Sequence, residues 1–87
     1  MDINNYSYVN YSYNSPQAII ASCGYASIEI DCNWFNELSF LVIDPLNDIF
    51  ESFGFNRYDD VEIRQAYEKA ARLYNSLVPD DSAIPVF

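Results

Sequence analysis

The sequence predicts an α+β fold: a small antiparallel sheet of three or four strands packed by two C-terminal helices. Apolar and polar residues alternate through residues 28–34, which is typical of a strand with one buried and one wet face. After residue 43, two segments each begin with a residue that suits a helix N-cap, and their apolar residues recur with the period of a helix. We expect the strands between about residues 5 and 43, and the helices at 45–53 and 60–77. At 87 residues and 51% hydrophobic, the chain fits one domain, 1–87, with 1–5 and 79–87 as candidate flexible ends.

The first expected element is a tyrosine-rich segment that repeats Tyr-Ser-Tyr. Strand alternation places Tyr6 and Tyr8 on one face and Tyr11 and Tyr13 on the other, with a bulge or turn near Asn10. An edge strand is favoured because tyrosine suits a pleated surface. The alternative is a mobile arm that orders when a partner binds.

Two strands and a hairpin are expected next. Residues 17–23 are apolar and compatible with a strand, and Gly24 provides a turn before the run 25–34. In that run Glu29 and Asp31 are expected on the wet face. The expected buried face consists of Ile28, Ile30, Cys32 and Trp34. The continuous apolar run 38–43 predicts a central strand covered on both faces, although a helical segment remains an alternative.

The first expected helix has clear boundary signals. Asp44 suits the N-cap and Pro45 suits the first helical position. Gly54 suits the position after the last turn. At a helical period, Asp44, Asp48 and Glu51 project together from the side opposite the apolar residues. This pattern predicts an amphipathic helix with an acidic outer stripe.

The second expected helix begins after Asp59, which with Glu62 has the spacing of a capping box. Two pairs, Asp60–Arg64 and Glu68–Arg72, have the i, i+4 spacing of ion pairs. The expected apolar face consists of Ile63, Ala66, Tyr67, Ala70, Tyr74 and Leu77. The C-terminal tail carries apolar residues that we expect to dock on the chain's own core: Ile84, Val86 and Phe87.

Charge is distributed unevenly along the chain. The formal net charge is −9, and all four cations lie within residues 57–72, whereas the first 56 residues hold seven carboxylates and no cation. An acidic region with no internal counter-charge projects its field outward and selects a positively charged partner. The same balance argues against direct binding to nucleic acid or to anionic membrane, because phosphate neutralisation needs cations.

Several chemistries lack their usual residues. The chain has no histidine, the commonest general base and a common metal ligand. Cys23 and Cys32 lack the spacing of a zinc site, and the two isolated glycines cannot form a phosphate-binding loop. We therefore predict a non-enzymatic protein without cofactor or metal.

The polar amino terminus gives no signal segment, and no apolar run approaches the roughly 20 residues that span a bilayer. With two cysteines that read as reduced, the predicted location is the cytoplasm, or the host-cell cytoplasm for a phage-encoded chain.

The acidity predicts an inhibitor that blocks a basic, nucleic-acid-handling protein such as a nuclease. Glu29 and Asp31, two apart on a strand face, would stand roughly 7 Å apart, close to the spacing of successive phosphates. In composition the chain resembles small acidic blockers: anti-CRISPR and anti-restriction proteins of phages, and immunity proteins of nuclease toxins. Carboxylates would mimic nucleic acid and tyrosines would anchor the contact. The predicted partner-binding residues are Glu29, Asp31, Glu37, Asp44, Asp48, Glu51, Tyr6, Tyr8, Tyr11 and Tyr13.

The alternative function is a structural or assembly module. An unprotected edge strand at the tyrosine-rich segment would pair copies of the chain into a homodimer, and the acidity would then serve solubility alone.

Overall fold

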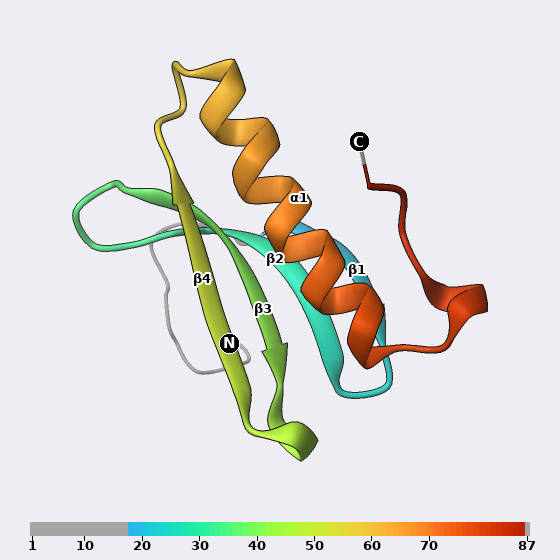
Figure 1. Ribbon diagram of the computed structural model, residues 1–87. Helices are drawn as coiled ribbons and strands as arrows, with labels where there is room; N and C mark the ends of the chain where they lie inside the picture. Colours follow the sequence, from blue (N-terminus) through green and yellow to red (C-terminus); the bar gives the residue numbers. More distant parts are fainter. Residues whose placement is uncertain (1–17, 87) are drawn as a thin grey trace.

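The computed structural model describes residues 18–86, which form a four-stranded antiparallel sheet and one α-helix (Figure 1). The strands follow one another across the sheet in the order β1-β2-β3-β4, so each pairs with its neighbour in sequence. The predicted α+β class and small antiparallel sheet are confirmed, but the described residues form one C-terminal helix, not two, and the fourth strand lies beyond the predicted range 5–43. The elements are β1 (Ala18–Cys23), β2 (Ala26–Cys32), β3 (Leu38–Asp44), η1 (Pro45–Asn47), β4 (Ile49–Phe55), α1 (Asp60–Leu77) and η2 (Asp80–Ser82).

The β1–β2 hairpin forms where the sequence predicts it. Gly24 has φ +60°, a left-handed conformation that glycine adopts at little cost, and the two-residue turn brings Cys23 opposite Ala26. The register of β1 shifts between Ile19 and Ala21, so a bulge interrupts this edge strand. The predicted tyrosine-rich strand precedes β1 and lies outside the described residues.

The core lies between the sheet and α1, which crosses one face of the sheet diagonally (Figure 1). Ile28 on β2 and Val42 on β3 are paired and fully buried under the helix. β3 pairs with β2 on one side and β4 on the other, which confirms the predicted central strand. We call the surface under α1 the helix-covered face and the opposite surface of the sheet the back face.

The second predicted helix is confirmed as α1. The Asp59 side chain caps it by accepting the N–H groups of Val61 and Glu62 at 3.0 and 3.2 Å. The Glu62 carboxylate reaches back to accept the N–H of Asn56 at 2.9 Å, so the two carboxylates fix the loop that enters the helix. The buried residues of α1 are Ala66, Ala70, Ala71 and Tyr74, and all of them except Ala71 belong to the core between helix and sheet.

The first predicted helix, at residues 45–53, is wrong. Asp44 does act as a cap, since its carboxylate accepts the N–H of Leu46 at 3.2 Å, but the turn that follows is only the three-residue η1. Asp48 then adopts φ +56°, a left-handed conformation that stops helical growth.

The residues after Asp48 form β4 instead. Isoleucine and phenylalanine favour strands, and the period of two in this segment places Ile49, Phe53 and Phe55 against the core under α1. Gly54, predicted to end a helix, lies within the strand. Ile49 and Phe53 satisfy both periods, and pairing with β3 along seven residues decided between them.

The C-terminal tail docks on α1, and the prediction that its apolar residues pack on the chain's own core is confirmed for Ile84. The Asn75 side chain donates to the carbonyl of Ile84 at 2.9 Å and accepts its N–H at 2.8 Å, and the Ile84 side chain packs against the core. Phe87 lies outside the described residues.

Candidate protein-binding site

The predicted acidic residues do not gather on one surface. Glu29 and Asp31 lie on the back face, as their alternation in β2 predicts, whereas Glu51 pairs with Val42 and lies on the helix-covered side of β4. Asp48 is exposed in the β3–β4 turn, and Glu37 is exposed in the β2–β3 loop. The predicted stripe of Asp44, Asp48 and Glu51 therefore does not form, because the helix that would align it is absent. Tyr6, Tyr8, Tyr11 and Tyr13 lie outside the described residues.

Glu29 departs from its predicted wet environment, since its residue is only 5% exposed. Its Oε2 atom is buried and accepts no hydrogen bond from the described residues 18–86. Removal from water, with the nearby charge of Asp31 as a smaller contribution, raises the pKa of Glu29 above its ordinary value. This carboxylate is therefore poorly placed to present charge to a partner.

Asp44 is also buried, and its carboxylate is used within the chain. One oxygen caps η1, and the other accepts a hydrogen bond from the side chain of Asn47 at 2.7 Å. The Asp44 carboxylate stabilises the β3–β4 connection. This structural role explains why an acidic residue stands at this position without invoking a binding partner.

The β2–β3 loop, by contrast, presents two large aromatic residues to solvent: Trp34, 74% exposed, and Phe35, 78% exposed. Trp34 was predicted on the buried face of β2, but β2 ends at Cys32 and the chain turns before reaching it. The flanking Asn33 and Asn36, both turn-forming residues, are the sequence signal for this loop.

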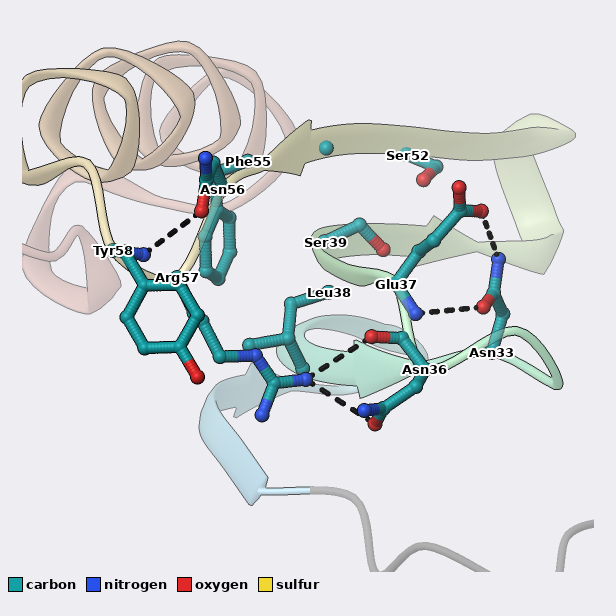
Figure 2. Close-up of a pocket in the computed structure, with 11 residues that line it drawn as sticks. Asn33, Asn36, Glu37, Leu38, Ser39, Ser52, Phe55, Asn56, Arg57 and Tyr58 are labelled. Carbon is teal, nitrogen blue, oxygen red and sulfur yellow. Dashed lines mark hydrogen bonds between the residues drawn. The ribbon is translucent and has the colours of Figure 1, made fainter.

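Asn33 organises the loop through its side chain. Its Oδ1 atom accepts the N–H groups of Phe35 and Glu37, both at 2.9 Å, and its Nδ2 atom donates to the Glu37 carboxylate at 2.9 Å. Figure 2 shows the two contacts between Asn33 and Glu37. Asn36 takes φ +64°, which asparagine tolerates better than most residues. The aromatic residues therefore project from a turn whose backbone is fixed by hydrogen bonds.

The loop between β4 and α1 joins the same end of the molecule. One Arg57 nitrogen, Nη2, donates to the backbone carbonyl and the side-chain oxygen of Asn36, at 3.0 and 3.2 Å (Figure 2). The next residue, Tyr58, is 88% exposed, and its N–H is held by the Asn56 side chain at 3.0 Å. We call Trp34, Phe35 and Tyr58 the aromatic end.

An open cleft of about 550 Å³ lies between these two loops. Small residues of β3 and β4, Ser39, Ser52 and Gly54, line it. The β2–β3 loop, Arg57 and Tyr58 border it (Figure 2). Glu37 is the carboxylate in the lining. Within residues 18–86, no group of three or more metal-ligating side chains comes together.

Negative charge is little compensated around these elements. The ion pair among residues 18–86 is Arg72–Glu68 at 2.9 Å, one of the two predicted on α1, and Asp60–Arg64 does not form. Four carboxylates, Glu37, Asp59, Asp60 and Glu62, belong to the two loops of the aromatic end or to the helix turn that follows them.

The described residues thus define a four-stranded antiparallel meander covered by a single helix, with an exposed aromatic end between acidic residues. No protein-family model, no curated protein and no solved structure significantly matches this chain. Across residues 18–86, no helix has both the length and the apolar character that crossing a membrane would require.

Proposed function

We propose that this protein is a non-enzymatic inhibitor that binds a basic, nucleic-acid-handling protein and blocks it, with the aromatic end as its contact site. The observation that carries the proposal is the exposure of Phe35 and Tyr58, at 78% and 88%, on two loops tied together by hydrogen bonds. Apolar side chains exposed together on one part of a surface often mark a protein interaction site.

The geometry favours tight contact. Tryptophan and tyrosine are the residues that most often dominate binding energy, and each supplies a large area for the loss of few rotatable bonds. Asn33 and Arg57 already hold the loops in place, so little backbone ordering remains for the moment of binding. Both residues act as positioning residues for the aromatic side chains.

The charge supports a basic partner. At a net charge of −9, the chain attracts cationic surfaces and speeds association with them, by about 10- to 1,000-fold at low salt. Grooves that bind DNA or RNA are strongly cationic. Glu37 and Asp60 flank the aromatic end and would form an anionic rim around an aromatic centre, the arrangement expected of a binding surface with a polar edge.

Of the two inhibitory mechanisms, the anchored plug is better supported than the pure nucleic-acid mimic. A mimic needs lines of exposed carboxylates, but Glu29 and Asp44 are both buried. A plug needs aromatic anchors with acidic neighbours, and the aromatic end provides them. Anti-CRISPR, anti-restriction and nuclease-immunity proteins are the functional classes that the proposal covers.

Inhibition assays with purified effectors test the proposal. The protein would be added in increasing ratio to restriction nucleases, toxin nucleases and CRISPR effectors during cleavage of a DNA or RNA substrate. We expect at least one effector to lose cleavage at a near-stoichiometric ratio, with inhibition weakening as salt is raised. If no effector in the panel is inhibited at low salt, the proposed function is wrong.

A further inference from the structure

The two edges of the sheet are protected to different degrees. A bulge interrupts β1, which is a common device against unwanted pairing. β4 has none: its seven residues pair with β3 without a register shift, and it contains no Lys, Arg or Pro. Among residues 18–86, no strand pairs with the outer side of β4. A regular, unprotected edge of this kind is a template for another strand.

A hollow lies beside that edge on the back face. Ser39 on β3 pairs with Gly54 on β4. The serine side chain is small and the glycine has none, so the surface is low at this pair. Ser52 is the next residue of β4 on the same face, and the three residues line the cleft described above. A strand added beyond β4 would place one side chain beside Gly54, where an added Cβ would meet only the Leu38 carbonyl, at 3.8 Å.

A carboxylate stands at this hollow. Figure 2 shows the Glu37 side chain extending from the β2–β3 loop toward Ser52, with Oε1 accepting the hydrogen bond from Asn33. Within residues 18–86, Oε2 accepts no hydrogen bond. The hollow therefore offers an anionic acceptor to a side chain entering from the β4 edge.

We propose that β4 binds an extended, cation-bearing segment of the basic partner as a fifth strand, with a lysine or arginine over Gly54 facing Glu37. Alternation in that strand would place apolar side chains beside Phe53 and Phe55 on the helix-covered side. The inference deepens the proposed function and rests on it for the partner's positive charge. A second copy of the chain is disfavoured as the occupant, because each copy carries a net charge of −9.

Peptide binding followed by NMR tests this inference. The probe is a capped heptapeptide that alternates valine and lysine, and its matched control replaces every lysine with glutamate. We expect the lysine peptide to shift the backbone amides of β4 (Ile49–Phe55) with a dissociation constant of about 0.1–1 mM, and the glutamate peptide to bind at least about tenfold more weakly.

Two variants test whether a lysine of the bound peptide lies at Gly54 and Glu37. Gly54→Val fills the hollow, and the fold has room for it, since an added Cβ would meet nothing closer than the Leu38 carbonyl at 3.8 Å. Glu37→Gln removes the charge. Each should weaken the lysine peptide by about three- to tenfold, whereas Ser22→Val, at the exposed β1 edge, should leave binding unchanged. Unchanged amide spectra away from the substitution would show that each variant is folded.

The inference is overturned if the lysine peptide shifts no β4 amide at millimolar concentration, if the shifts fall on β1 or the aromatic end and not on β4, or if the glutamate peptide binds equally well. It is also overturned if the chain sediments as a dimer whose β4 amides are protected without peptide, because a second copy then occupies the edge. Failure of the proposed function is a separate result: no effector is inhibited, although the lysine peptide still binds β4.

Discussion

On the helix-covered face of the sheet, Ile28 and Val42 have no solvent exposure, whereas Phe35 and Tyr58 at the aromatic end are mostly exposed. Both regions consist of large apolar side chains, yet only the first is covered by the described chain. The helix-covered face supplies the burial that stabilises the fold. The aromatic end exposes its apolar side chains to solvent. Hydrogen bonds of Asn33 and Arg57 hold the backbone of its two loops in place. Folding and binding should therefore be separable by substitution.

The largest effect on stability is expected from Ile28→Ala. Truncation of a fully buried side chain loses burial and leaves a cavity, so the free energy of unfolding should fall by about 2–5 kcal/mol. Urea denaturation followed by circular dichroism measures the change. The control is Ile19→Ala, in the same sheet but largely exposed, which should change stability by at most about 0.5 kcal/mol. Similar losses in both variants would contradict the assignment of the core.

A smaller effect is expected from Asp59→Ala, which removes the N-cap of α1. The N–H groups of Val61 and Glu62 would lose their acceptor, and stability should fall by about 0.5–2 kcal/mol. Asp60→Ala, one residue on and not a cap, should cost clearly less. The same urea transitions measure both, and equal losses would show that charge near the helix terminus matters more than the cap.

The two capping aspartates show what the sequence determined. Asp44 and Asp59 are both followed by apolar residues at helical spacing, and both caps form. After Asp59 the segment contains alanines and long side chains that favour a helix, so α1 was predictable. After Asp44 the isoleucine and phenylalanines fit a strand equally well, and pairing with the preceding strand β3 decided the outcome.

The candidate site was less predictable than the fold. Composition identified acidity and aromatic richness, but Trp34 continued the alternation of β2 and therefore read as buried. Only the turn fixed by Asn33 places it outside. Burial of Glu29 could not be derived either, because alternation assigns a residue to a face of the strand without stating what covers that face.

Glu29→Gln tests whether stability also depends on the back face. The raised pKa means that the folded state binds the proton more tightly than the unfolded state does. Glu29 therefore stabilises the fold below its ordinary pKa of 4.5, and this contribution is lost as the pH rises through the raised value. The glutamine variant lacks this dependence, so near neutral pH it should be more stable than the wild type, by about 1 kcal/mol.

Thermal unfolding over a pH series measures that difference, which should close at acidic pH. Asp48→Asn, which removes one exposed carboxylate from the β3–β4 turn, is the matched control for the loss of one negative charge. An equal or lower stability of Glu29→Gln near neutral pH would contradict a desolvated carboxylate at this position.

The smallest change in stability is expected from the double substitution Phe35→Ala and Tyr58→Ala. Both side chains are exposed, so the free energy of unfolding should change by no more than about 0.5 kcal/mol. Differential scanning calorimetry measures it. A loss of several kcal/mol would place these residues in the core and remove the contrast between the two regions.

The most direct test of the central claim is the dissociation constant of that double variant for an inhibited effector, measured by surface plasmon resonance. The matched control is Tyr25→Ala with Leu46→Ala, two exposed residues in the turns at the opposite end of the sheet. If the aromatic end is the contact site, the Phe35 and Tyr58 variant should bind at least about 30-fold more weakly, and the control within about threefold of wild type. Equal affinities for the two variants, or a greater loss in the control, would contradict the claim.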